Sequence, residues 1–165
     1  MKKGLLILWL SALLVLSGCG KSGNVVEYND SFVAIVKECT DSTQELFYVY
    51  EASNSDVDSI KEALEKSINI CKNSESKASK MWDFDKDSSL KDAVVKLLST
   101  EVDYLEKFWS TSDYRNLDTI TDEDKTAYDS LASELYLTEE TLNDQFSSLQ
   151  QSQELFAAKH WLKLE

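Results

Sequence analysis

An all-α fold, an antiparallel up-down-up-down four-helix bundle with a long final helix, is predicted by two features of this 165-residue sequence. The chain has no proline, and its four glycines, Gly4, Gly18, Gly20 and Gly23, all precede Asn24. Turn-rich β folds depend on glycine and proline, whereas helix interiors do not. After Asn24, apolar residues recur every three or four positions, as on the buried face of a helix. Short links between such helices favour antiparallel neighbours.

The apolar pattern predicts four helices. The first runs from about Val25 to Tyr50, and the second carries apolar positions from Val57 to Trp82. The third carries them from Leu90 to Trp109, and the fourth runs from Asp122 to about Leu162. At about 1.5 Å per residue, the fourth helix would be about 60 Å long and the first only about 40 Å. We therefore expect the fourth helix to bend near residues 137–139 or to extend past the bundle at its C-terminal end.

Three of the expected helix starts carry capping residues. Ser55–Asp58 and Thr121–Asp124 resemble capping boxes in which Asp replaces the usual Glu. In each box a side-chain oxygen can accept a free backbone N–H, and the acids suit the positive end of the helix dipole. Asp87 or Ser88 can cap the third helix.

Residues 1–18 have the pattern of a bacterial lipoprotein signal peptide. Lys2 and Lys3 precede about a dozen residues of low polarity, too few for a membrane-spanning helix of about 20 residues. Leu16–Cys19 then supplies a bulky aliphatic residue, two small residues and a cysteine, as at a lipoprotein cleavage site. We expect Cys19 to carry the lipid, residues 19–24 to form a lipidated tether and residues 25–165 to form the bundle. The alternative is an ordinary secretory signal in which the position of Cys19 is a coincidence.

The mature chain would be strongly acidic. Without Lys2 and Lys3, 15 of the 17 basic residues face 30 acidic residues, a formal charge of −15. Such a surface repels nucleic acid and anionic lipid headgroups, so we expect no nucleic-acid partner and attachment to the membrane through the acyl chains alone. The expected location is the cell envelope. In a diderm cell this is the outer membrane facing the periplasm, and in a monoderm cell the outer face of the plasma membrane.

The two other cysteines predict a disulfide between Cys39 and Cys71. If the first link lies near Asn54, the two residues stand at heights of about 23 and 26 Å along neighbouring helices. Both fall on apolar faces, and the envelope is an oxidising compartment. The alternatives are two reduced thiols in the core or a redox-active pair, although the spacing is unlike a C-x-x-C motif.

Motifs for catalysis and for cofactor binding are absent from the sequence. A di-iron bundle or a Cys/His zinc site needs more histidine than the one residue the chain has, His160. No nucleotide-binding glycine pattern occurs either. The acids of residues 83–87 alternate as in a calcium-binding EF-hand, but Ser88 and Val94 stand where that loop needs Gly and Glu. We expect no enzyme activity, no cofactor and no metal, and we interpret residues 83–87 as a turn that caps the third helix, with weak calcium binding as the alternative.

The predicted topology gives the two ends of the bundle different compositions. The end near the tether collects apolar residues and two lysines: Met81, Trp82, Phe84, Trp161, Leu162, Leu164, Lys159 and Lys163. The opposite end collects acids: Asp56, Asp58, Asp113, Asp118, Asp122, Glu123 and Asp124. The first group is interpreted as a plug that closes the bundle, or as tryptophans seated among lipid headgroups. The second is interpreted as complementarity to helix dipoles, or as a docking surface for an envelope protein with a basic surface.

Three short segments carry a family resemblance. Cys19, Tyr28-Asn29-Asp30 near the start of the first helix, and the segment 156–160 (Phe-Ala-Ala-Lys-His) together resemble the YiiG-like bacterial lipoproteins, an uncharacterised family. The resemblance spans most of the mature chain. It implies a helical-bundle lipoprotein and carries over no catalytic residue.

The function favoured by the sequence is that of a non-enzymatic, membrane-anchored envelope lipoprotein that presents its bundle to another protein. The alternative is a helical bundle that binds a small molecule or lipid, which needs a cavity among apolar residues such as Phe32, Phe47, Leu64, Leu97, Phe108 and Phe146. An enzyme or metal protein would need a cleft with convergent acids.

Overall fold

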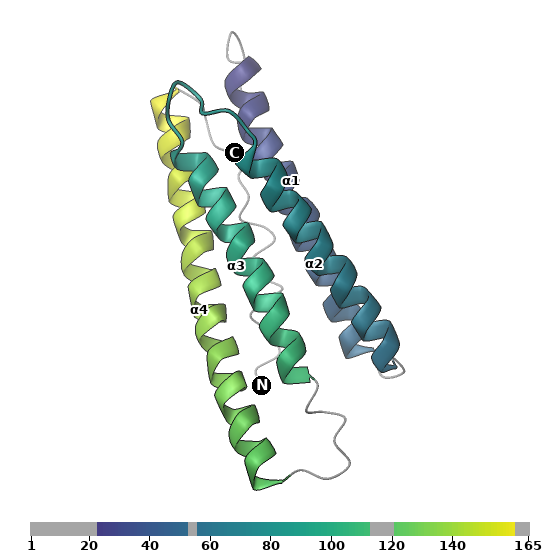
Figure 1. Ribbon diagram of the computed structural model, residues 1–165. Helices are drawn as coiled ribbons and strands as arrows, with labels where there is room; N and C mark the ends of the chain where they lie inside the picture. The colour runs from purple at the N-terminus through teal and green to yellow at the C-terminus, as the bar shows by residue number, and fades with distance from the viewer. Residues whose placement is uncertain (1–22, 53–55, 113–120, 161–165) are drawn as a thin grey trace.

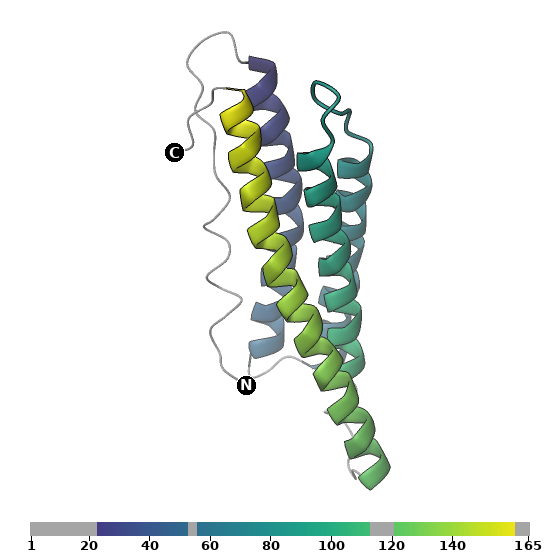
Figure 2. The same ribbon diagram turned by 90° about the vertical axis from the view of Figure 1, so that its left-hand side faces the viewer.

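The computed structural model describes residues 23–52, 56–112 and 121–160. Its four helices are α1 (Gly23–Glu51), α2 (Val57–Ser79), α3 (Ser89–Ser112) and α4 (Asp122–Lys159). Each helix runs antiparallel to its neighbour in sequence, as Figures 1 and 2 show, so the predicted all-α bundle with a long final helix is confirmed. The predicted signal peptide and Cys19 lie outside the described residues. Because α1 begins at Gly23, the last two residues assigned to the tether are helical.

The core lies between the four helices and is built mainly from aliphatic and aromatic side chains. Extensive packing contacts join α1 to α2, α2 to α3 and α3 to α4. The backbones of α1 and α4 approach less closely, and large side chains bridge them. The rings of Tyr28 and Phe156 lie 5.5 Å apart, and Gln153 donates a hydrogen bond to Asn29.

The long final helix extends past the bundle at its N-terminal end, not at the C-terminal end where we expected an overhang. All the buried residues of α4 lie at or after Thr138: Thr138, Leu142, Gln145, Leu149, Gln153, Phe156 and Ala157. The 16 residues from Asp122 to Leu137 contain no fully buried residue, and in both ribbon views the start of this part of α4 projects beyond the end of α3. Its last residues lie beside α3, where Leu135 packs against the core and Glu134 and Leu137 line a groove. We call residues 122–137 the overhang. The expectation failed because an apolar pattern assigns polar residues to the surface. The buried face of α4 includes the polar residues Gln145 and Gln153 beside its leucines, so its C-terminal part lies within the bundle.

The link between α2 and α3 begins earlier than expected, because α2 ends at Ser79 and Trp82 is not helical. The chain then reverses in a tight turn in which the Asp87 N–H donates to the Phe84 carbonyl at 2.9 Å. Asp85 and Lys86 occupy the turn with φ angles of 50° and 64°. Positive φ angles are common in glycine and uncommon in other residues, yet here Asp and Lys adopt them.

The helix starts agree in part with the predicted caps. Thr121 and Asp124 form the expected capping box, with both reciprocal hydrogen bonds present. The side chain of Asp87 accepts the N–H of Ser89 at 3.0 Å, as expected for a cap of α3. At α2 the capping residue is Asp56, whose side chain accepts the Ser59 N–H at 2.7 Å, so the box predicted one residue earlier is wrong.

Candidate functional site

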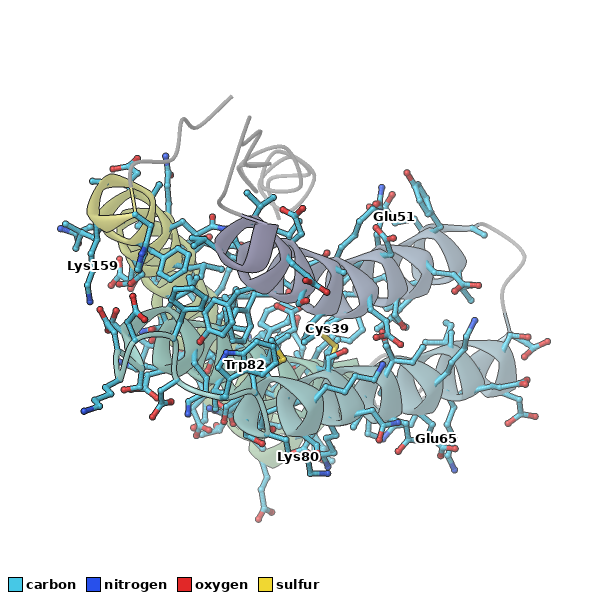
Figure 3. The ribbon with its side chains drawn as sticks, turned by 90° about the horizontal axis from the view of Figure 1, so that it is seen from above. Cys39, Glu51, Glu65, Lys80, Trp82 and Lys159 are labelled. Carbon is cyan, nitrogen blue, oxygen red and sulfur yellow. A yellow bond between two sulfur atoms is a disulfide. The ribbon has the colours of Figure 1, made fainter. Side chains whose placement is uncertain are left out.

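The predicted disulfide joins α1 to α2 in the core. The sulfur atoms of Cys39 and Cys71 lie 2.05 Å apart and the two Cα atoms 4.6 Å apart. Both residues are fully buried. Figure 3, which looks down the bundle, shows the yellow sulfur atom of Cys39 between these helices. The prediction made from the height of each cysteine above the first link is confirmed.

A buried polar layer lies beside the disulfide. The Thr43 hydroxyl donates to the Cys39 carbonyl at 3.2 Å and lies 3.9 Å from the Cys71 sulfur. Glu101 of α3 is only 4% exposed, and burial raises its pKa to about 7, against the opposing effect of a hydrogen bond with Thr43. A low-polarity environment disfavours the charged carboxylate, which explains the direction of the shift. Sequence reasoning missed Glu101, because an acid within a helix is ordinarily placed on the solvent face.

Hollows open on the surface of the bundle between neighbouring helices. One is a groove of about 500 Å³ between α3 and α4, and another is a hollow of about 210 Å³ between α1 and α2. Neither is lined by Glu101 or by the six apolar residues among which a ligand cavity was considered. Four of those six are buried, and Phe47 and Phe146 pack against the same core.

The groove between α3 and α4 is lined mainly by polar side chains: Ser99, Thr100, Asp103, Lys107, Glu134, Leu137, Thr138 and Thr141. The Lys107 ammonium group bridges the two helices, since it donates to Asp103 at 2.7 Å and to Thr138 at 3.0 Å. The positive charge of Lys107 is therefore already engaged by side chains of the groove itself. Glu134 of the overhang lines the same groove but forms no ion pair with another described residue.

Exposed apolar side chains adjoin this groove. Tyr136 is 60% exposed and Leu137 is 59% exposed, and Leu137 itself lines the groove. A hydrogen bond with Glu140 and the charge of that carboxylate raise the pKa of Tyr136. Large exposed apolar side chains among polar ones are typical of a protein-binding surface. We call Glu134, Tyr136, Leu137 and Glu140 the overhang patch.

The predicted acidic surface divides into two groups among the described residues. Asp56 and Asp58 lie at the start of α2, and residues 122–124 lie at the start of α4. The start of α4 lies well beyond the α1–α2 link in both ribbon views, so the two groups do not form one continuous surface. The remaining two acids, Asp113 and Asp118, lie outside the described residues. The sequence missed the overhang patch, because Tyr136 and Leu137 do not belong to the apolar spacing that predicted the fourth helix.

The opposite end carries the aromatic cluster. The ring of Phe84 lies 5.2 Å from that of Tyr28 and 5.6 Å from that of Phe156, which closes the core as a plug. Burial raises the pKa of Tyr28, and the backbone N–H of Phe84 opposes this effect. Met81 is partly buried against the core, whereas Trp82 is exposed. The other predicted members of this end, Trp161, Leu162, Lys163 and Leu164, lie outside the described residues.

The acids considered as a calcium loop are engaged by basic side chains. Asp83 pairs with Lys91, and Asp87 pairs with Lys159 at 2.7 Å, which holds the pKa of Asp87 well below its usual range. Within residues 23–52, 56–112 and 121–160, no three His, Cys, Asp or Glu side chains come together as a metal site. In the same part of the chain, no helix combines the length and apolarity required to cross a bilayer.

Comparison with known proteins adds no assignment. No protein-family model matches the chain, and neither the curated proteins nor the solved structures contain a significant match.

Proposed function

We propose that this protein is a non-enzymatic envelope lipoprotein, anchored through Cys19, which presents the α4 overhang to a protein partner. The observation that carries the proposal is the overhang itself. The first 16 residues of α4 contain no fully buried side chain, although Leu135 packs against the core, and this segment holds Tyr136 and Leu137 in water. Burial of these side chains against a partner would remove that exposed apolar surface.

The charge of the overhang indicates the chemistry of the partner. Residues 122–137 contain five acids, Asp122, Glu123, Asp124, Asp129 and Glu134, and one lysine, Lys125. The lysine of the adjoining groove, Lys107, is already paired with Asp103. A partner with a basic surface and apolar side chains would complement both features, and opposite charge also accelerates association.

The anchor is supported by the sequence of residues 1–19 and by the topology. Cys19 precedes the first residue of α1 by four residues, so a lipid on its thiol would hold the end of the bundle that carries the α2–α3 link near the membrane. The overhang lies at the opposite end of the bundle from the start of α1 (Figure 1), so it would then point away from the bilayer. The resemblance to YiiG-like lipoproteins supports the same proposal.

Site-specific photocrosslinking in living cells tests the docking surface. A benzophenone amino acid at position 137 is expected to give one discrete protein adduct, whereas the same group at position 155, where Leu155 is 65% exposed on the same helix, gives none. Glu134→Lys is expected to abolish the adduct, and Glu65→Lys, the same charge change at an exposed site on α2, is expected to leave it. No adduct at position 137, or equal adducts at both positions, contradicts the docking surface.

Metabolic labelling tests the anchor separately. The wild-type chain is expected to incorporate labelled palmitate and to sediment with membranes, and Cys19→Ser is expected to do neither. A wild-type chain without label contradicts the lipid anchor, whatever the crosslinking result.

A further inference from the structure

The α2–α3 link presents an exposed tryptophan at the tether end of the bundle. Trp82 is 61% exposed, although its ring lies 5.6 Å from that of Tyr28. Figure 3 looks onto this end and shows Trp82 close to other aromatic rings, with Lys80 and Lys159 toward the periphery. Tryptophan is enriched at membrane–water interfaces, because its ring is apolar and its N–H is polar.

The link is held in place by the core beneath it. Phe84 packs between Tyr28 and Phe156, which come from the first and last helices. The turn that follows puts Asp85 and Lys86 at positive φ angles, a conformation that non-glycine residues keep only when their surroundings enforce it. Trp82 and Lys86 therefore project from a fixed base.

The charges of the link leave two lysines without a counter-charge. Two of its three acids pair with lysines, Asp83 with Lys91 and Asp87 with Lys159, and the third, Asp85, lies 3.8 Å from the Nδ1 atom of His160. Lys80 and Lys86 flank Trp82 and are exposed, and no ion pair joins either of them to another described residue. Two acids, Glu27 and Asp30, are also exposed near the start of α1 and would repel lipid phosphates. Attraction to lipid phosphates is therefore confined to the two lysines of the link.

The length of chain before α1 brings the link within reach of the bilayer. Gly23 lies four positions after Cys19, and at full extension these four steps span about 14 Å. The headgroup region on each side of a bilayer is several ångströms thick, which further reduces the gap.

We propose that the α2–α3 link seats on the membrane, with Trp82 in the headgroup layer and Lys80 and Lys86 on lipid phosphates. The inference rests on the proposed anchor at Cys19 and deepens it. A lipid on a short tether fixes only one point of the bundle, whereas a second contact at Trp82 fixes its orientation. The bundle then stands upright, and the overhang faces away from the bilayer.

Photocrosslinking to lipid tests the proposal on the lipidated full chain, reconstituted in vesicles of phosphatidylethanolamine and phosphatidylglycerol. A benzophenone amino acid replaces Trp82 in one protein and Tyr48 in another. Tyr48 is a matched control, because it is aromatic, 62% exposed and near the far end of α1. Lipid adducts are expected from position 82 and not from position 48.

Charge variants provide the second readout. Lys80→Ser with Lys86→Ser is expected to lower the yield of lipid adduct at position 82 at least about threefold, because each basic residue near an anionic surface contributes to binding. Lys61→Ser with Lys125→Ser removes the same charge from exposed lysines at the other end and is expected to leave the yield unchanged.

Flotation of the vesicles separates this proposal from the anchor. If the protein floats and position 82 gives no lipid adduct, or both positions give equal adducts, the seating of Trp82 is overturned while the anchor stands. If the wild-type protein does not float, the anchor and the seating fall together.

Discussion

Gln153 of α4 donates a hydrogen bond from its Nε2 atom to the Oδ1 atom of Asn29 in α1, at 3.2 Å, with both side chains buried. The pair sets the register of the last helix against the first. From Asn29 to the end of α1 at Glu51 is about 33 Å, and from Gln153 back to the start of α4 at Asp122 is about 47 Å. The excess of about 14 Å is the length by which the first part of the overhang, about nine residues, projects past the end of α1.

A double-mutant cycle on this pair is the first prediction. Gln153→Leu is expected to cost about 1–3 kcal/mol in the free energy of unfolding, because it leaves the amide of Asn29 buried without a partner. Asn29→Leu with Gln153→Leu is expected to recover most of that cost, because no amide then remains buried. Urea denaturation measures all four proteins. Gln151→Leu, on the exposed face of the same helix, is the control, and a double variant as unstable as the two single variants combined would contradict the coupling.

The disulfide gives the second prediction. Cys39→Ser with Cys71→Ser is expected to lower the free energy of unfolding by about 3–4 kcal/mol, because the bond closes a long loop in the unfolded chain. Dithiothreitol should lower the urea midpoint of the wild-type protein by a similar amount. The reductant should leave the midpoint of the double serine variant unchanged, and a wild-type midpoint indifferent to reduction would contradict the bond.

Glu101 gives a prediction with a defined pH dependence. Its pKa in the folded protein is about 7, above the ordinary value of 4.5, so between these pH values the folded state holds a proton that the unfolded state has lost. Stability is therefore lost as the pH rises through this window, by up to about 3 kcal/mol above pH 7. Glu101→Gln is expected to be the more stable protein at pH 8 and to lose that advantage near pH 4.5.

Urea denaturation at a series of pH values measures this difference between the variant and the wild type. Glu106→Gln is the matched control on α3, because Glu106 is exposed and pairs with Lys72 at the surface. It should show no comparable change with pH. A constant difference between Glu101→Gln and the wild type from pH 4.5 to 8 would disprove the raised pKa.

The topology and the disulfide were predictable because both follow from distances along rigid helices. The position of Cys39 before the first link and that of Cys71 after it place the two sulfur atoms at one level, whatever the other residues do. The end at which α4 extends past the bundle was not predictable in this way. It depends on the pairing of Asn29 with Gln153, two polar residues that an apolar pattern assigns to the surface.

The site was predictable to a smaller extent. The acids at the helix starts were recognised, yet the projection of α4 separates them, and Tyr136 and Leu137 emerge as the exposed apolar pair. Only contacts between helices distinguish an apolar residue in the core from one on an overhang. The same limit applies to Trp82, whose spacing fits α2 although the helix ends before it.

Two leucines on α4 test where the helix begins to support the fold. Leu142 is buried and Leu137 is not, although the two are only five positions apart on the same helix. Leu142→Ala is expected to cost about 2–5 kcal/mol, because it leaves a cavity in the core. Leu137→Ala is expected to change stability by less than about 0.5 kcal/mol, as at other exposed sites. If urea denaturation finds equal costs, residues 122–137 contribute to the fold, and Leu137 is then not available to a partner. If the costs differ as expected, loss of the adduct from a benzophenone amino acid at position 136 in the Leu137→Ala protein reports on binding alone, because the bundle remains folded.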